Sequence, residues 1–110
     1  MPFDKFDFES TKEERIKSIK KTIRPIGVDE VKKMGDQLFK FADDPWRSAF
    51  FGFIAEHPNA SYHHAVTHDQ VNILYCQEND RGIWFLPGSG LGPLQANGKK
   101  AMSDAIASLH

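Results

Sequence analysis

The chain has 110 residues and a formal net charge of −1; 40% of its residues are hydrophobic and 26% are charged. This composition is typical of a globular protein and excludes a disordered chain. The near-neutral charge excludes a strong overall field for nucleic acid or anionic membranes. The length favours one domain over residues 1–110.

The sequence also bears on cellular location. No apolar run approaches the roughly 20 residues needed to cross a bilayer, and the first residues do not resemble a signal peptide. We therefore expect a cytoplasmic protein with no membrane partner. Cys76 is the only cysteine, so an intramolecular disulfide is excluded, and its place in a predicted strand is typical of a small buried side chain.

Residues 1–9 form a short arm that precedes the first helix signal. Phe3, Phe6 and Phe8 lie there among charged residues. Exposing three aromatic rings to water is unfavourable. We therefore expect the arm to dock on its own domain or on a neighbouring subunit.

Two or three helices are predicted after the arm. A capping box at Ser10–Glu13 starts a basic helix that continues to about Ile23 and stops before Pro25. A second helix is predicted over residues 29–42, and a third, rich in aromatic residues, begins at Asp44. The apolar stripe of the second helix comprises Val31, Met34, Leu38 and Phe41. We expect the third helix to lie directly on the sheet.

Residues 60–86 are predicted to form a three-stranded antiparallel meander, because runs of β-branched and aromatic residues alternate with short polar turns. Large apolar side chains point to both faces of the second and third strands, so helices or a second subunit should cover both faces. A last helix, ending near Leu109, completes an α+β fold. The predicted core comprises Trp46, Phe50, Phe53, Ile73, Tyr75 and Phe85.

The first candidate site is the glycine-rich loop between the meander and the last helix. Such a loop can direct backbone N–H groups at an anion, and two nearby lysines strengthen this interpretation. The predicted anion-binding residues are Gly88, Ser89, Gly90, Gly92, Lys99 and Lys100. The spacing completes neither a P-loop nor a dinucleotide fingerprint, so a plain connector is the simpler alternative.

Other constellations are weaker. His64, His68 and Asp69 can approach one another at a turn, but they lack a known metal-site spacing, and polar strand residues are the better interpretation. Cys76 or Ser89 as a hydrolytic nucleophile lacks the setting that such chemistry needs. The basic first helix lacks the other signals of nucleic-acid binding, which is not an expected partner.

The sequence therefore favours a small non-enzymatic binding or protein-interaction module that self-associates, most simply as a homodimer. We expect its interface to include Phe3, Phe6, Phe8 and Trp84. The alternative is an anion- or nucleotide-handling protein, with a small enzyme included in that class, that uses loop 88–92 with Lys99 and Lys100. The sequence identifies no cofactor.

Overall fold

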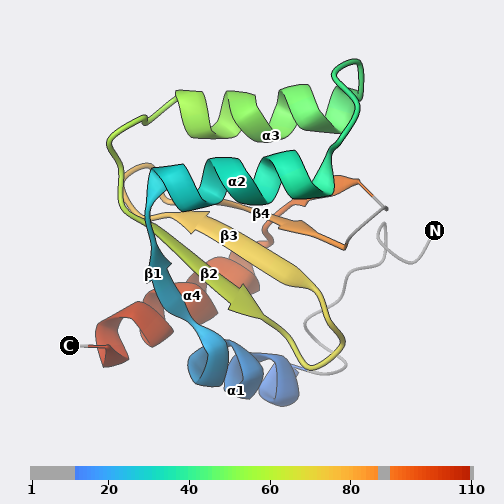
Figure 1. Cartoon of the computed structure of the whole chain (residues 1–110). Coiled ribbons are helices and arrows are strands. Elements are labelled where there is room, and N and C mark those ends of the chain that lie inside the picture. The colour runs from blue at the N-terminus through green and yellow to red at the C-terminus, as the bar shows by residue number, and fades with distance from the viewer. Residues whose placement is uncertain (1–11, 87–89, 110) are drawn as a thin grey trace.

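The structure is a computed structural model that describes residues 12–86 and 90–109. A β-sheet lies between two helical layers, with α2 and α3 on one face and α1 and α4 on the other (Figure 1). The fold is α+β, as predicted. The elements in chain order are α1 (Lys12–Thr22), β1 (Arg24–Ile26), α2 (Val28–Leu38), α3 (Pro45–Ala55), β2 (Tyr62–Val66), β3 (Asn72–Cys76), β4 (Arg81–Phe85), β5 (Leu91–Pro93) and α4 (Ala96–Ser108).

The sheet has five antiparallel strands in the order β1-β2-β3-β4-β5. The predicted meander forms its centre, but the predicted count of three strands is wrong, because β1 and β5 add a short strand at each edge. Both edge strands contain proline, Pro25 and Pro93. Proline lacks an N–H donor, so within a sheet it is tolerated at edges, and the same residues in a sequence indicate helix stops and loops.

The predicted second helix is too long. α2 ends at Leu38, and Phe39 leaves the helical conformation with φ −121° and ψ 83°. This change turns the Phe39 ring into the core, where its centroid lies 5.4 Å from that of Phe50. Phe41 therefore falls outside the helix and is 74% exposed, contrary to its predicted place on the apolar stripe.

Helix α3 begins as its sequence indicates. Pro45 occupies the first turn, and the Asp44 carboxylate accepts a hydrogen bond from the Trp46 N–H at 2.8 Å. The prediction that Trp46 is buried is wrong, since its side chain is 46% exposed. The first turn of α3 lies beside Gly90, and the Trp46 indole packs against the Gly90 backbone: a Cβ atom at Gly90 would lie 2.9 Å from Trp46 Cε2.

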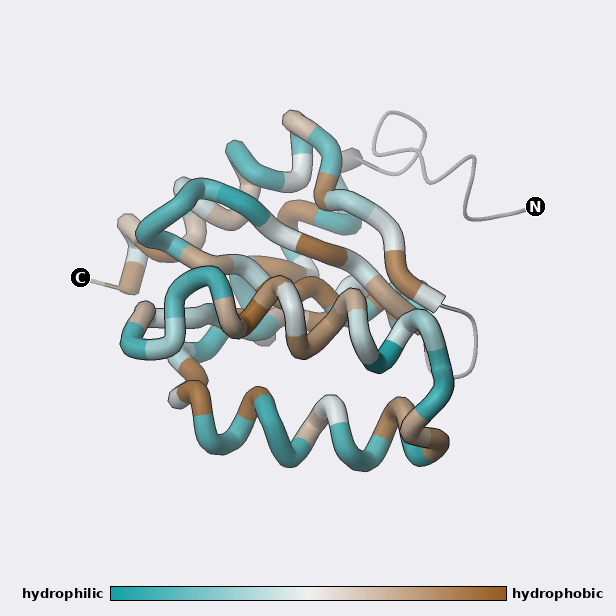
Figure 2. Tube along the Cα trace, turned by 90° about the horizontal axis from the view of Figure 1, so that it is seen from above, coloured by the Kyte–Doolittle hydropathy of each residue, from teal (hydrophilic) through white to brown (hydrophobic). Residues whose placement is uncertain are grey.

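The other five predicted core residues are buried, and they divide between two clusters, one on each face of the sheet. Ile73 and Tyr75 of β3 face α1 and α4, whereas Phe50, Phe53 and Phe85 pack on the other side. Hydrophobic and hydrophilic residues also recur along the turns of the α2–α3 layer (Figure 2). Helices of this chain thus cover both faces, so a second subunit is not required for that purpose.

Helix α4 begins at Ala96 after the N-cap residue Gln95. Its buried stripe includes Ala101, Met102, Ala105 and Ile106, while Leu109 is 46% exposed. In the described part of the chain, no helix combines the length and apolar character needed to cross a membrane.

Candidate binding groove

A groove of about 500 Å³ runs between α3 and the β4–β5 edge of the sheet. One wall is a single stripe of α3, formed by Ala49, Gly52, Phe53 and Glu56. These positions follow the i, i+3, i+4, i+7 spacing that aligns side chains along one helix face. The opposite wall consists of residues from β4, β5 and the segment that joins β5 to α4.

Gly52 keeps the α3 wall low. A Cβ atom built at this glycine meets nothing within 4 Å, so no close contact requires a glycine there. A glycine inside a helix destabilises it by roughly 0.5–1 kcal/mol relative to alanine. Gly52 therefore lowers the stability of α3, and the missing side chain leaves space in the groove.

The strand wall is thin for a different reason. Large side chains pack directly against both Gly82 and Gly92. A Cβ atom added at Gly82 would lie 2.6 Å from Leu94 Cδ2, and one added at Gly92 would lie 2.4 Å from the Trp84 ring. These contacts hold β5 closely on β4. The partly exposed side chains of Ile83 and Leu91 form the apolar floor beside them.

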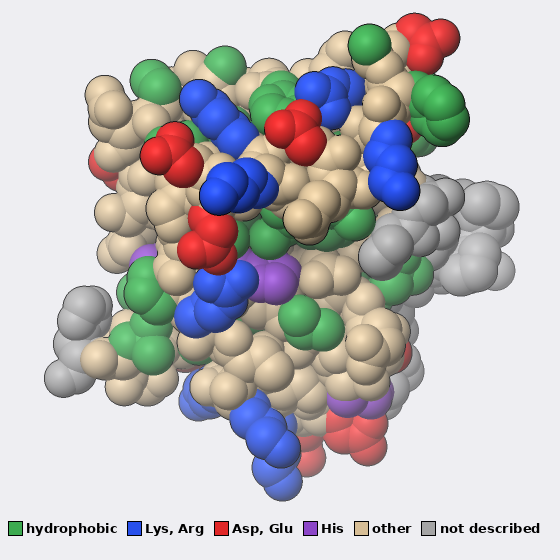
Figure 3. All heavy atoms as spheres, viewed as in Figure 1, with side chains coloured by type: hydrophobic (Ala, Val, Ile, Leu, Met, Phe, Trp, Pro, Cys, Tyr) green, Lys and Arg blue, Asp and Glu red, His purple; other side chains and the backbone are tan. Residues whose placement is uncertain are grey.

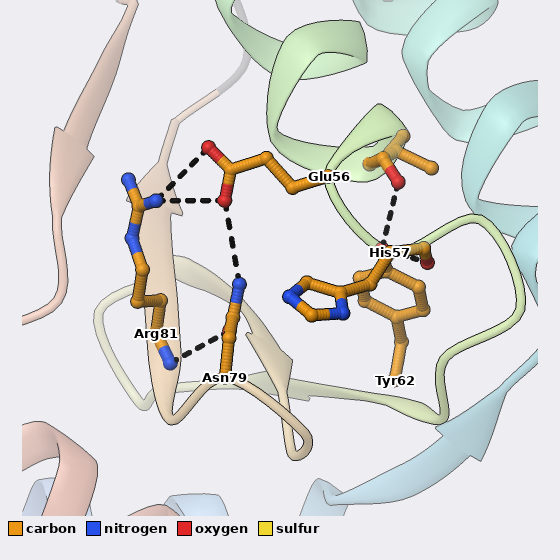
Figure 4. Close-up of polar contacts among 6 residues, drawn as sticks. Glu56, His57, Tyr62, Asn79 and Arg81 are labelled. Carbon is orange, nitrogen blue, oxygen red and sulfur yellow. Dashed lines mark hydrogen bonds and ion pairs between the residues drawn. The ribbon is translucent and has the colours of Figure 1, made fainter.

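The polar end of the groove is an ion pair between Glu56 and Arg81 (Figure 4). Arg81 Nη1 lies 2.9 and 2.7 Å from the two carboxylate oxygens of Glu56. Asn79 donates to the same carboxylate at 3.4 Å and accepts from the Arg81 backbone N–H at 3.0 Å. The Arg81 guanidinium also lies 6.0 Å from the Phe53 ring centroid. These contacts join the C-terminal end of α3 to the start of β4.

Tyr62 anchors the same end of α3 from beneath (Figure 4). Its hydroxyl proton is shared between the carbonyl oxygens of Ile54 and His57, at 3.1 and 3.0 Å, which also accept backbone N–H groups of His57 and Ala60. Burial, reinforced by nearby Cys76, raises the pKa of Tyr62 to about 12. His57 Nδ1 lies 3.5 Å from a carboxylate oxygen of Glu78.

Lys99 supplies the second cation of the groove. It lies in the first turn of α4, is half-buried and lines the groove. It forms no ion pair with a side chain in residues 12–86 or 90–109. The helix dipole disfavours a cation at this position, so an anionic group in the groove would find an unsatisfied partner.

The structure divides the predicted anion-binding residues. Lys99 and Gly92 line the groove, whereas Lys100 lies 81% exposed on α4 with its Nζ 3.8 Å from Asp104. Gly90 has φ +87° and packs against Trp46. Gly88 and Ser89 lie outside the described residues. Two of the described members, Gly92 and Lys99, thus belong to a groove that the sequence did not indicate.

The three predicted metal ligands do not converge. His64 Nε2 lies 3.0 Å from the side-chain oxygen of Asn72, and burial lowers the pKa of His64. His68 lies 3.1 Å from Glu14 of α1. Among the described residues, no group of three or more His, Cys, Asp or Glu side chains is placed to hold a metal ion.

Asp69 instead attaches α1 to the β2–β3 turn. Arg15 Nη2 lies 2.7 Å from its carboxylate, and the Thr67 hydroxyl donates to the second carboxylate oxygen. Burial alone would raise the pKa of Asp69, but the Thr67 hydrogen bond and the Arg15 charge outweigh it and hold that pKa below its ordinary value.

The predicted interface residues fall in two places. Trp84 is 5% exposed and packs in the core on the α1–α4 face, because its β4 position points away from the groove. It therefore offers little surface to a second subunit. Phe3, Phe6 and Phe8 lie outside the described residues. Cys76 is fully buried.

Charged side chains of both signs are interspersed over the α2–α3 layer (Figure 3). One such pair is Arg47 with Asp36 at 2.8 Å. This face thus has no dominant sign of charge. Comparison with known protein families, with curated proteins and with solved structures finds no match.

Proposed function

We propose that the protein is a small non-enzymatic binding module whose ligand lies in the groove between α3 and the β4–β5 edge. The volume of about 500 Å³ falls in the range of ordinary ligand sites. The groove combines an apolar floor with few charged groups, which is the usual composition of such sites. The ligand class that fits is an apolar or aromatic body bearing an acidic group.

The observation that carries this proposal is the position of Lys99. A half-buried cation without an ion-pair partner among the described side chains faces a groove whose other cation, Arg81, is already paired with Glu56. Charge-assisted hydrogen bonds are about twice as strong as neutral ones. An acidic ligand group at Lys99 would therefore contribute both affinity and orientation.

The lining supports binding more than catalysis. Nucleophilic catalysis needs an activated nucleophile next to a base, and the described lining includes no Ser, Cys or His. The one carboxylate, Glu56, is engaged by Arg81 and Asn79. This proposal keeps one feature of the predicted anion-handling alternative, because the ligand carries an acidic group.

The test uses 8-anilinonaphthalene-1-sulfonate, an aromatic anion whose fluorescence increases in apolar sites. Gly52→Leu should abolish saturable binding by filling the groove, and Lys99→Gln should weaken it about tenfold, which corresponds to about 1.4 kcal/mol. The matched controls are Ala55→Leu, exposed on the same helix, and Lys100→Gln, adjacent but outside the groove. Equal binding by all four variants would contradict the proposal.

A further inference from the structure

We propose that the ligand's acidic group is a carboxylate, held by an unused edge of the Arg81 guanidinium together with Lys99. This inference rests on the proposed function, because it takes the groove to be a binding site. It goes further by naming the ligand class, a small carboxylic acid with an apolar body, and by making Arg81 the residue that selects it.

Arg81 uses only one of its side-chain nitrogen atoms in the ion pair with Glu56. Nη1 contacts both carboxylate oxygens, and within residues 12–86 and 90–109 no hydrogen bond uses Nη2 or Nε. In Figure 4 the second terminal nitrogen of Arg81 points away from Glu56. A guanidinium carries five N–H donors in a planar fork. The Nη2–Nε edge therefore retains two parallel donors, the arrangement that binds both oxygens of one carboxylate.

Glu56 and Asn79 hold the Arg81 side chain in position. The Arg81 backbone N–H donates to the Asn79 side-chain oxygen at 3.0 Å, and Asn79 donates to the Glu56 carboxylate at 3.4 Å. The guanidinium also lies 6.0 Å from the Phe53 ring centroid. A side chain that is already oriented loses less conformational entropy when a ligand binds. Glu56 is therefore a positioning residue for Arg81.

Lys99 borders the same end of the groove as Arg81. The Leu94 N–H donates to the carbonyl oxygen of Gly82, the residue after Arg81, at 2.9 Å. Helix α4 begins two residues after Leu94, at Ala96, and Lys99 lies in its first turn. Both cations line the groove near the start of β4. We therefore place the carboxylate of the ligand between them.

The charge of the groove favours a ligand with a single negative charge. Its described lining contains two cations, Arg81 and Lys99, and one carboxylate, Glu56, which leaves a charge of +1. A carboxylate ligand neutralises this charge. A phosphate monoester carries about −1.5 to −2 at pH 7, so it would leave excess negative charge beside Glu56.

The length of the groove sets the size of the apolar body. Leu91 pairs with Phe85, four residues along β4 from Arg81, and four strand residues span about 13 Å. On the opposite wall, the α3 stripe from Glu56 back to Ala49 covers seven residues, about 10 Å of helix. The two walls agree in length. The ligand is therefore a carboxylic acid with a small ring system or a short chain.

The first experiment compares three ligands that share one aromatic body: naphthoic acid, naphthamide and naphthyl phosphate. Each competes with the anilinonaphthalene probe for the unmodified chain. The acid should bind about tenfold more tightly than the uncharged amide, and more tightly than the phosphate. Equal affinities of the acid and the amide, or tighter binding of the phosphate, would overturn the proposal.

The second experiment repeats the comparison in Arg81→Lys, which keeps the positive charge but removes the fork. The ratio of acid affinity to amide affinity should fall about fivefold, a modest change because Arg81 is partly exposed. Both ligands bind the same variant, so a general loss of stability cancels from the ratio. Arg47→Lys, whose ion pair with Asp36 lies outside the groove, should leave the ratio unchanged. A ratio that survives Arg81→Lys overturns the role given to Arg81.

The probe distinguishes failure of this inference from failure of the proposed function. If the anilinonaphthalene probe binds the unmodified chain but not Gly52→Leu, and the acid and the amide displace it equally, only the carboxylate assignment is refuted. If the probe does not bind, or binds Gly52→Leu equally well, the binding groove itself is refuted.

Discussion

At the scale of single residues, Phe50 is the centre of the α2–α3 side of the core. Its side chain is fully buried, and its ring lies 5.4, 5.9 and 5.9 Å from those of Phe39, Phe51 and Phe85. Phe50→Ala should lower the free energy of unfolding by about 3–5 kcal/mol, as other large core aromatics do. Urea unfolding measures this change. A loss below about 1 kcal/mol, which is typical of surface positions, would contradict the described packing of α3.

Gly52 follows Phe50 by two residues, on a different side of α3, and should respond in the opposite sense. Because nothing lies within 4 Å of an added Cβ atom, Gly52→Ala should stabilise the chain by about 0.5–1 kcal/mol. The same methyl group projects into the groove, so binding of the anilinonaphthalene probe should weaken while the melting temperature rises. A simultaneous gain in stability and in affinity would argue that the groove lies elsewhere.

At the scale of elements, the position of β5 depends on Gly92. An added Cβ atom would lie 2.4 Å from the Trp84 ring, inside the packed core, so either the indole or the strand must move. Gly92→Ala should therefore destabilise the chain by about 1–3 kcal/mol, the usual cost of overpacking. Gly52→Ala is the matched control, since both glycines line one groove. Thermal unfolding that ranks the two variants equally would refute this account of the strand wall.

The attachment of α1 to the β2–β3 turn should depend on pH. The pKa of Asp69 is depressed in the folded chain, so its stabilising effect is present above its ordinary value of 3.8 and is lost as pH falls through the lower folded value. Asp69→Asn should cost about 1 kcal/mol at neutral pH, a modest amount because the pair is partly exposed. Urea unfolding at pH 7 and again near pH 2 should show this difference disappear; a cost that is unchanged at low pH would indicate a role other than charge. Asp104→Asn, in an exposed pair, serves as control.

The elements also show what sequence patterns can predict. The meander and the helices were accessible because alternation or helical spacing persists over at least five residues in each. β1 and β5 were not, because a strand of three residues containing a proline has too few positions to show a period of two. Phe41 and Trp46 both fit the helical spacing of the predicted apolar stripes. Helix α2 nevertheless ends at Leu38, before Phe41, and Trp46 in the first turn of α3 is exposed.

The groove was inaccessible from sequence because its walls come from distant segments. Glu56 and Arg81 are 25 positions apart and follow no motif, and Lys99 comes from a third element. One local signal was present. Gly52 interrupts an aromatic helix where alanine would be more stable, and a glycine at such a position leaves space beside the helix.

At the scale of the whole molecule, we propose that the β5 edge with its α3 wall is a binding surface. This proposal does not depend on where the ligand comes from, because any aromatic anion could contact both the apolar floor and Lys99. The most direct measurement is an amide-shift titration of the full chain with 8-anilinonaphthalene-1-sulfonate. We expect saturable shifts concentrated at Gly52, Arg81 and Leu91–Leu94. Saturable shifts centred on another part of the fold, or none at all, would contradict it.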